Sequence, residues 1–246
     1  MSDDALYDPI ARIYDPWSAS VTEDVAFYVE EALASGGPVV ELAVGTGRIA
    51  VPIAKAGIPV IGVDLSGEML AVAREAAARE GVSELVDLRV GDIRTPPVDG
   101  PVPLVTIPFR SLLHLPNDEE KLHVLRAAYD LLEPGGRLVF DVFAPSREDI
   151  EETHGRWLER ERGIFERADW DETARTLTLS VRSGDAAVSF DLHWLGAAEW
   201  DALIARAGFE LETVYGWFDR RPYAGDEDTI WVCRAPAGVR ASTDQE

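Results

Sequence analysis

Three carboxylates and two glycines lie where short apolar runs of the sequence end. Glu41 is inside the run PVVELA, Asp64 follows the run IPVIGV, and Asp92 follows the third such run along the chain. Gly45 and Gly47 come directly after the first run, where a chain must turn tightly and let a ligand approach its backbone. A helix that begins behind such a turn presents free N–H groups to polar ligand atoms. This spacing predicts a binding site for a polar organic ligand.

The two later carboxylates suit the two halves of an adenosine group. A carboxylate at Asp64 can accept hydrogen bonds from both ribose hydroxyls. Asp92 can accept a hydrogen bond from the exocyclic amine of adenine, while Ile93 packs on the face of the base. We therefore expect the ligand to be an adenosine cofactor.

Two kinds of adenosine cofactor remain open at this point. The segment GTGRIA also fits the pattern G-x-G-x-x-A, which is typical of nicotinamide dehydrogenases. Against a dehydrogenase, Glu41 would repel a pyrophosphate but attract a sulfonium or an ammonium group. Asp92 adds a third carboxylate to the same edge, and no Tyr-x-x-x-Lys motif follows the later strands.

Residues 38 to 145 have the pattern of strands that alternate with helices. Ser66 is a good N-cap residue, and Asn117 with Glu120 forms a capping box for a helix that runs to about Leu132. Strands in such an order pair in parallel through right-handed crossovers, and their ligands bind beyond the carboxyl ends of the strands. The predicted strands are 38–43, 58–63, 85–90, 102–109 and 137–143. A helix is predicted to begin near residue 47, after the first strand. The segment EPGG separates the helix that runs to about residue 132 from the last of these strands.

The two flanks depart from this pattern. Ser20 and Glu23 form another capping box and predict a helix over residues 20–34. The turn SGD at residues 183–185 predicts a hairpin, which we interpret as a small antiparallel insertion. The remaining predicted elements are the hairpin strands 176–182 and 187–194, a helix over 197–207, and the strands 209–217 and 229–234.

With this set of motifs, the sequence resembles the class I S-adenosylmethionine-dependent methyltransferases. The segments that carry the resemblance are, in chain order, VVELAVGTGRIAVPIAKAG, VIGVDLSGEMLAVARE, GDIR, PFRSLLHL, LLEPGGRLVFDVF and AEWDALIARAGFELETVYGWFDRRPY. The resemblance extends from about Tyr7 to Arg234, and the ordered set of motifs is more specific than any one of them.

The resemblance and the alternation together imply an α/β fold. We expect a Rossmann-like, doubly wound, mostly parallel seven-stranded sheet with an N-terminal helical cap and a small antiparallel β insertion. We expect one methyltransferase domain over residues 1–236, divided into the cap (1–36), the cofactor-binding core (37–145), the β insertion that roofs the site (150–195) and the terminal helix and strands (196–236), followed by a disordered tail (237–246).

The resemblance also implies roles for individual residues of the cofactor site. Glu41 and the turn that follows it would hold the methionine part of S-adenosylmethionine, Asp64 would hold the ribose, and Asp92 the adenine. Tyr14 resembles an aromatic residue that closes over the cofactor. The full set of expected cofactor-binding residues is Tyr14, Glu41, Ala43, Gly45, Thr46, Gly47, Arg48, Asp64, Leu65, Met69, Gly91, Asp92, Ile93, Ile107, Pro108 and Phe109.

Three residues are candidates for a catalytic role. His114 follows the fourth predicted strand, and His193 lies in the predicted insertion; a neutral imidazole at either position could take a proton near pH 7. Packing or a backbone hydrogen bond is the alternative explanation for each histidine. Arg110 stands where the family has a smaller polar residue, and its guanidinium could bind a substrate carboxylate or turn outward to solvent. A base is needed only if the methyl acceptor arrives protonated.

The composition limits the partners. The chain has 246 residues and a formal charge of −22, which repels the phosphates of nucleic acids and anionic lipid surfaces. Cys233 is the only cysteine, so no disulfide can form within the chain, and no cluster of metal ligands is apparent. The acidic start lacks the pattern of a secretion signal, and no apolar run spans a bilayer. We expect a cytoplasmic protein with a small-molecule methyl acceptor, no metal, no nucleic-acid or membrane partner, and a monomeric or homodimeric state.

Three functions remain as hypotheses. The favoured one is methyl transfer from S-adenosylmethionine to an amine or hydroxyl of a small molecule by in-line displacement. The second is an NAD(P)-dependent oxidoreductase that uses the same glycine turn. The third is a non-catalytic protein that binds an adenosyl ligand.

Overall fold

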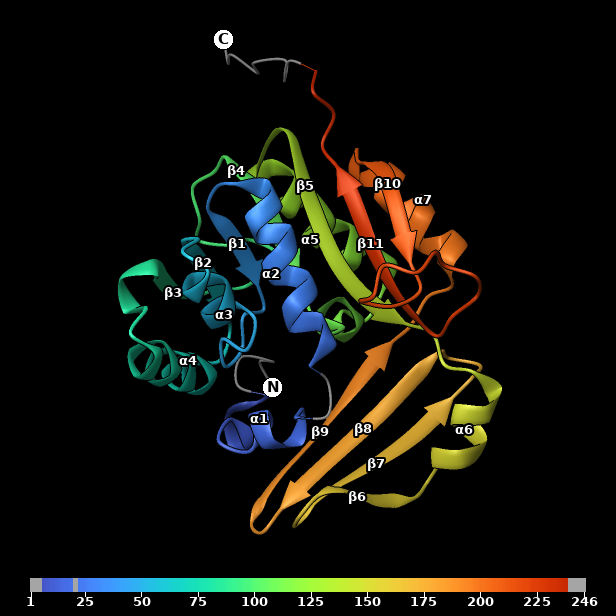
Figure 1. Cartoon of the computed structure of the whole chain (residues 1–246). Helices are drawn as coiled ribbons and strands as arrows, with labels where there is room; N and C mark the ends of the chain where they lie inside the picture. The colour runs from blue at the N-terminus through green and yellow to red at the C-terminus, as the bar shows by residue number, and fades with distance from the viewer. Residues whose placement is uncertain (1–5, 20–21, 239–246) are drawn as a thin grey trace.

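The protein consists of a large sheet covered by helices on both faces and a smaller sheet beside one edge of it (Figure 1). The computed structural model describes residues 6–19 and 22–238. Most of the tail predicted for 237–246, Ser20 of the predicted capping box and the first five residues of the cap lie outside this range.

In the described part of the chain, the large sheet has seven strands in the order β10-β11-β5-β4-β1-β2-β3. The strands from β5 to β3 pair in parallel, and β11 pairs antiparallel with β5 and with β10. The mostly parallel, doubly wound sheet predicted from the sequence is therefore confirmed. The strand bounds are β1 Val39–Leu42, β2 Val60–Asp64, β3 Val86–Val90, β4 Val102–Ile107, β5 Leu132–Phe143, β10 Glu210–Tyr215 and β11 Asp228–Arg234.

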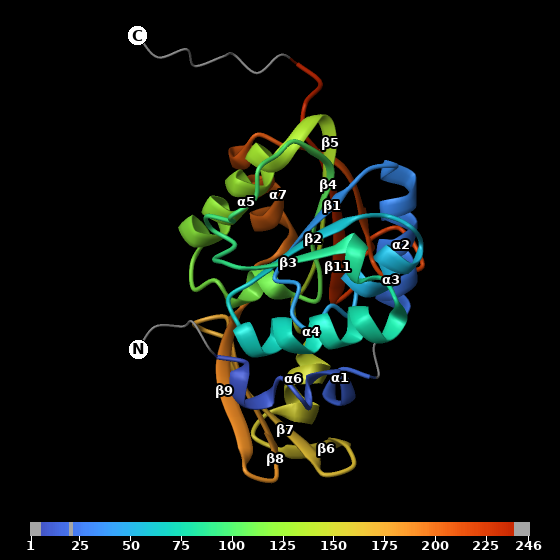
Figure 2. The ribbon, with the colours of Figure 1, turned by 90° about the vertical axis from the view of Figure 1, so that its left-hand side faces the viewer.

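Helices cover both faces of this sheet because each presents an apolar stripe to it. Figure 2 shows α2 and α3 on one face and α5 and α7 on the other. The central strands read as apolar runs because they are buried on both faces; all four residues of β1 are buried. The helix bounds are α1 Tyr14–Trp17, α2 Glu23–Ser35, α3 Ala50–Lys55, α4 Gly67–Glu80, α5 Asp118–Leu131, α6 Arg147–Thr153 and α7 Ala197–Ala207, with 3-10 turns η1 Asp8–Ile10, η2 Ser83–Leu85 and η3 Ser111–His114.

The strand order reverses beside β1, which lies between β2 and β4. In an open parallel sheet this reversal opens a crevice at the carboxyl ends of the strands, where ligands bind. In Figure 1 these ends point toward η1, α1 and the smaller sheet. The fold therefore brings the cap and the insertion to the edge that the sequence predicts to bind the ligand.

The smaller sheet is an antiparallel meander of four strands within the described residues. Its strands are β6 Trp157–Glu161, β7 Ile164–Asp171, β8 Thr176–Ser183 and β9 Ala186–His193. Burial alternates along β8, where Leu177, Leu179 and Val181 are buried and their neighbours are more exposed. One face of this sheet therefore packs on the rest of the molecule, and it lies inside the range 150–195 expected for the insertion.

The sequence predicted only two of these four strands, and it missed α6. The strands β6 and β7 carry charged side chains on both faces, so they lack the alternation by which a strand is recognised. They form through pairing: β8, which does alternate, pairs with β7 from Phe165 to Asp171, and β7 pairs with β6. The N-cap of α6 is Ser146, whose side chain accepts a hydrogen bond from the amide of Asp149.

Several predicted boundaries are wrong by a few residues. The strand predicted to start at Arg137 starts at Leu132, because the segment EPGG continues the strand: Gly135 donates to the carbonyl of Ala235, and Gly136 accepts from its amide. The fourth strand ends at Ile107 rather than at residue 109, because Phe109 adopts a left-handed conformation. Strand β10 covers 210–215 rather than 209–217.

The starts of two helices also differ from the prediction. The helix α2 begins at Glu23, with Thr22 rather than Ser20 at the N-cap. The helix α3 begins at Ala50 rather than near Gly47, because the turn before it takes three more residues. The cap at Asn117 is confirmed, since its side chain accepts a hydrogen bond from the amide of Glu120. No helix among the described residues is long and apolar enough to cross a bilayer.

Candidate active site

The glycine turn after β1 places backbone groups at the crevice. Ala43, Gly45 and Gly47 have left-handed φ angles of 62°, 55° and 77°. A Cβ atom on Gly47 would lie 3.2 Å from the Cβ of Ala73, so a side chain at this position would also crowd α4. Alanine at position 43 adopts the left-handed conformation in which glycine is more easily accommodated.

Asp64 links the ends of the first two strands. One carboxyl oxygen accepts a hydrogen bond from the amide of Gly45 at 2.9 Å, and the other accepts from the amide of Ser66 at 2.9 Å. Burial raises the pKa of this carboxyl, while these two amide bonds lower it. Each oxygen keeps a second lone pair for a ligand, so Asp64 suits two ribose hydroxyls. The neighbouring Leu65 is half-buried and Met69 is buried.

Glu41 is the least satisfied carboxyl of the site. It is 1% exposed, and its Oε2 atom has no hydrogen-bond partner among the described residues. Burial raises its pKa to about 8; Arg48 opposes the shift and Asp24 adds to it. A buried acceptor without a partner is costly, and a positively charged ligand group would remove that cost. This oxygen fits the ammonium and sulfonium groups of S-adenosylmethionine.

Asp92 lies where it was predicted, after β3, but its carboxylate already has a partner. Arg94 binds it with distances of 2.5 to 3.0 Å and holds its pKa below the usual value. Gly91 donates a backbone hydrogen bond to the carbonyl of Asp64, which joins the two loops, and Ile93 is half-buried beside them. A contact between Asp92 and adenine stays a prediction, and it requires Asp92 to share its oxygens with Arg94.

The cap binds the cofactor loops through the aspartates of its two Tyr-Asp pairs. Asp8 accepts a hydrogen bond from the hydroxyl of Ser66, and Asp15 accepts one from the hydroxyl of Thr46, each at 2.5 Å. The sequence marks these pairs, but the two aspartates were not among the predicted site residues. Their contacts place the aromatic residue of each pair over the carboxyl ends of the strands.

An aromatic cluster joins the cap, the core and the insertion. Its members are Tyr7, Tyr14, Trp17, Phe109, His114 and Phe190, with ring centroids 5.1 to 6.4 Å apart. Trp17 also donates a hydrogen bond from its indole to Glu166 of β7 at 2.8 Å. Tyr7, Trp17, Glu166 and Phe190 were not predicted as site residues, because their partners lie on elements far apart in the sequence.

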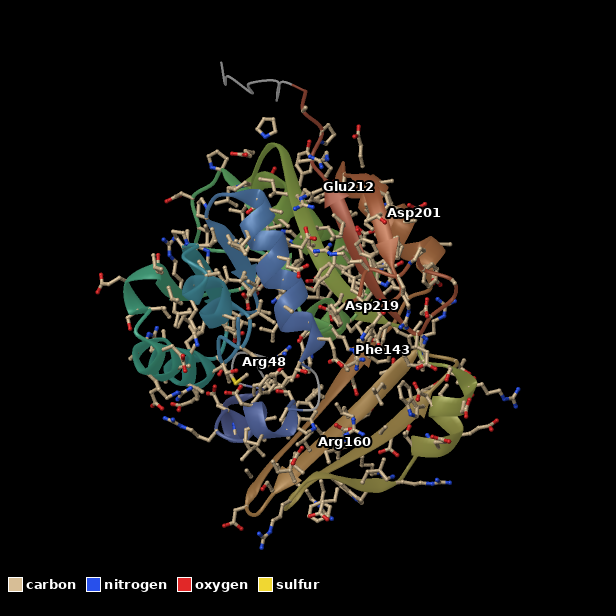
Figure 3. All side chains as sticks on the ribbon, in the orientation of Figure 1. Arg48, Phe143, Arg160, Asp201, Glu212 and Asp219 are labelled. Atoms are coloured by element: carbon tan, nitrogen blue, oxygen red, sulfur yellow. The ribbon has the colours of Figure 1, made fainter. Side chains whose placement is uncertain are left out.

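The loop after β4 carries the remaining predicted residues. Ile107 and Pro108 are buried, and the ring of Phe109 lies 6.2 Å from that of Tyr14 and 4.5 Å from the guanidinium carbon of Arg48. Figure 3 shows Arg48 and Phe143 along the boundary between the large sheet and the elements at its carboxyl edge.

Arg110 is held at the protein surface by an ion pair and does not extend freely into solvent. Its guanidinium binds Asp228 at 2.6 Å and lies 4.7 Å from the centre of the Phe143 ring. Its side chain is 41% exposed, so one side of the guanidinium stays accessible to a substrate carboxylate. The ion pair fixes the side chain, and a substrate carboxylate bound by Arg110 would share the guanidinium with Asp228.

The two predicted histidines lie in different surroundings. His114 contacts Tyr7 through Nε2 at 3.0 Å, and burial lowers its pKa to about 4, with further lowering from His193 and Lys121. A base with that pKa is a weak proton acceptor at neutral pH. His193 contacts Thr176 through Nδ1 at 3.1 Å and lines a shallow depression of about 430 Å³ beside Lys121.

Comparisons with known proteins identify the reaction class. A family model described as a methyltransferase domain matches residues 39–136. The protein YqeM of Bacillus subtilis (strain 168), whose name assigns it to the methyltransferases, is 26% identical over an alignment of 242 positions, which covers 90% of this chain and 94% of that one.

Solved methyltransferase structures extend the similarity over the whole fold. The CcbJ methyltransferase from Streptomyces caelestis is 29% identical with a TM-score of 0.80, and the match covers 96% of this chain and all of that one. CalS10, an amino pentose methyltransferase from Micromonospora echinaspora, is 23% identical with a TM-score of 0.61 over 86% of this chain and 90% of its own.

The fold, the glycine turn and these similarities define one class of enzyme. The protein is a class I S-adenosylmethionine-dependent methyltransferase. The nicotinamide oxidoreductase and the non-catalytic binding protein are set aside as functions, because the proteins that share the sequence and the fold are methyltransferases. Among the described residues, no group of three or more His, Cys, Asp or Glu side chains is arranged to hold a metal ion.

Proposed function

We propose that the protein transfers the methyl group of S-adenosylmethionine to an amine or hydroxyl of a small molecule. The observation that carries this proposal is the position of the insertion and the cap, which meet in the aromatic cluster over the carboxyl ends of the strands. An acceptor held there would be bounded by the core below and by β9 above. A site covered in this way by the cap and β9 would suit a small molecule better than a folded protein or a nucleic acid.

The reaction needs alignment more than it needs acid–base groups. A lone pair of the acceptor attacks the methyl carbon, the bond from carbon to sulfur breaks on the opposite side, and S-adenosylhomocysteine leaves with the electron pair. The cofactor supplies the activated methyl group; the chain's residues bind it, orient it and exclude water. An unprotonated amine becomes a methylated ammonium in the transfer step and releases a proton only afterwards. The low pKa of His114 is therefore no obstacle, because no base has to act during the transfer.

The residues expected to hold the cofactor divide between its two ends. We infer that Asp64 holds the ribose, that Asp92 and Ile93 hold the adenine, and that Glu41 attracts the positively charged methionine part. We infer that Tyr14 closes over the cofactor and that Phe109 faces the methyl group; their rings meet edge to face, with centroids 6.2 Å apart, where the cap meets the loop after β4. We infer that the sheet of β6 to β9 roofs this site.

Two further observations support a small acceptor. The formal charge of −22 disfavours nucleic acids and attracts cations, so an amine that is partly protonated in solution would be drawn to the protein. The same fold serves an amino pentose methyltransferase in CalS10. A hydroxyl acceptor remains within the proposal, and for that acceptor a base would have to remove the proton.

A labelled-methyl assay tests the proposal. The purified protein is incubated with S-adenosylmethionine carrying a labelled methyl group and, in separate reactions, with small amines, small alcohols and phenols, a peptide mixture, and transfer RNA. We expect label in a small amine or hydroxyl compound, with one S-adenosylhomocysteine formed for each methyl transferred. Label that enters only the peptides or the RNA would contradict the small-molecule acceptor.

A further inference from the structure

One face of α2 contacts both the glycine turn and the end of β5. Asp24 and Tyr28 lie one helical turn apart, and both are fully buried. Asp24 accepts two hydrogen bonds from the guanidinium of Arg48 in the glycine turn, at 2.9 and 2.5 Å. Tyr28 donates a hydrogen bond to the Oδ1 atom of Asp141 at the end of β5, at 2.6 Å. A single helix turn therefore reaches the glycine turn and the end of β5.

Asp141 in turn holds the loop after β4. Its Oδ1 atom accepts a hydrogen bond from the amide of Phe109 at 2.8 Å, and its Oδ2 atom accepts one from the amide of Arg110 at 3.0 Å. These two residues have φ angles of 57° and 63°, and left-handed conformations cost non-glycine residues about 1–2 kcal/mol each. Hydrogen bonds to a charged acceptor are about twice as strong as neutral ones, so the carboxylate of Asp141 offsets this strain.

Together with a contact between Arg48 and Phe109, these hydrogen bonds form a closed network. The guanidinium carbon of Arg48 lies 4.5 Å from the centre of the Phe109 ring. A continuous path therefore runs from Asp24 through Arg48 and Phe109 to Asp141, and returns through Tyr28 to the same helix. The glycine turn belongs to the cofactor side, and Phe109 belongs to the acceptor side.

We propose that Asp141, held by Tyr28, is a positioning residue for methyl transfer: it fixes Phe109 and Arg110 against the glycine turn, so that cofactor and acceptor keep one relative geometry. This inference rests on the proposed function. Asp141 acts through the backbone of its neighbours and need not touch the cofactor or the acceptor. Its effect should therefore appear in the rate of the transfer step, because a displacement of about 1 Å can reduce that rate by about 100-fold.

The charge state of Asp141 provides a signature of this role. Burial raises its pKa to about 6, and Asp24 adds to the shift, while the hydrogen bonds from Tyr28 and Phe109 and the charge of Arg110 oppose it. Arg48, from the glycine turn, is a further cation that faces this carboxylate. Protonation removes one acceptor from the carboxyl group, so the loop should loosen as the pH falls through about 6.

Two variants test the proposal in the full-length protein. In Asp141→Asn, one of the two backbone amides faces an NH₂ group, and we expect kcat to fall by about 10- to 100-fold with a much smaller change in KM. In Tyr28→Phe, all the backbone bonds remain but the Asp141 pKa rises, so we expect a near-normal kcat at pH 8 and an acid limb shifted to higher pH. Asp87→Asn, at an exposed aspartate of β3, and Tyr223→Phe, at an exposed tyrosine, are the matched controls.

A second measurement needs no acceptor and separates this inference from the proposed function. The amide NMR signals of Phe109 and Arg110 are followed against pH in the S-adenosylhomocysteine complex. We expect both signals to titrate together near pH 6 in the unmodified protein and at a higher pH in Tyr28→Phe. Signals that do not titrate, or an Asp141→Asn variant with unchanged kcat, would overturn the proposal. If Asp141→Asn fails to fold, the Tyr28→Phe shift decides alone.

Discussion

At the scale of single residues, the carboxyl groups of the candidate site differ in how many hydrogen-bond or ion-pair partners they have. Asp64 accepts two backbone hydrogen bonds and Asp92 is paired with Arg94, whereas one oxygen of the buried Glu41 has no partner among the described residues. A positively charged ligand gains most from the unpartnered oxygen, and a ligand with hydroxyl groups gains from Asp64. From this difference we expect the positively charged methionine part of the cofactor at Glu41 and the ribose at Asp64.

Replacing Asp64 should weaken cofactor binding. In Asp64→Ala, the ribose hydroxyls lose their acceptor and Gly45 loses the bond that fixes the glycine turn. We expect the affinity for S-adenosylhomocysteine, measured by calorimetry, to fall by about 1–3 kcal/mol. Asp87→Ala, at an exposed position of β3, should leave it unchanged. An unaltered affinity in Asp64→Ala would mean that Asp64 serves only the turn and the start of α4.

The raised pKa of Glu41 predicts a pH-dependent affinity. Below about pH 8 the free protein holds this carboxyl neutral, and a cationic ligand favours its ionised form. The affinity for S-adenosylmethionine should therefore rise between pH 6.5 and 8, by up to about tenfold per pH unit, and then level off. Calorimetry at three pH values measures this, and Glu41→Gln should remove the dependence. A slope that persists in Glu41→Gln would assign the proton to another group.

The same group affects the stability of the free protein in a definite direction. The pKa of Glu41 in the folded state lies above its ordinary value of 4.5, so the unfolded chain loses the proton first as the pH rises. Glu41 therefore contributes less to the free energy of unfolding at pH 8 than at pH 4.5. A bound cation reverses this contribution, because it stabilises the charged form in the folded protein.

At the scale of elements, the sequence predicted what depends on local pattern. The strands of the core, the cap at Asn117 and the position of Asp64 at the end of β2 follow from apolar runs and capping residues, and the structure confirms them. The strands β6 and β7 could not be predicted, because pairing makes them strands rather than their own pattern: β7 pairs with β8, and β6 pairs with β7.

The tertiary contacts of the site could not be predicted either, because they join residues that are far apart in the sequence. Asp141 is separated by about thirty residues from the two amides that it holds, and by more than a hundred from Tyr28. In the sequence it is one polar residue inside an apolar strand. Only the fold shows that Asp141 faces the loop after β4. Likewise, only the fold shows that Arg94 forms an ion pair with Asp92.

The start of α5 offers a test at this scale. The Asn117 side chain accepts a hydrogen bond from the amide of Glu120, at the end of the loop that carries His114. We expect Asn117→Ala to lower the free energy of unfolding by about 0.5–2 kcal/mol and Asn117→Gly by only a few tenths, since glycine tolerates the N-cap conformation. Urea denaturation of the two variants measures the difference. Equal losses would show that the side-chain cap contributes little.

At the scale of the whole molecule, two separate sheets meet at one edge. The large sheet supplies the glycine turn and the loop after β4, the cap supplies Tyr7 and Tyr14, and β9 of the smaller sheet supplies Phe190. The contact between Trp17 and Glu166 joins the cap directly to the smaller sheet. We infer that the loops of the large sheet determine which cofactor is bound, and that the cap and the smaller sheet determine which acceptor enters.

The structure of the complex with S-adenosylhomocysteine tests this account most directly. We predict that the ribose hydroxyls contact Asp64, that the amino group of the homocysteine part lies on the side of Glu41, and that the sulfur atom faces the boundary where Tyr14, Phe109 and Phe190 meet. A ligand bound with its sulfur directed away from the aromatic cluster, or bound outside the crevice beside β1, would contradict the account.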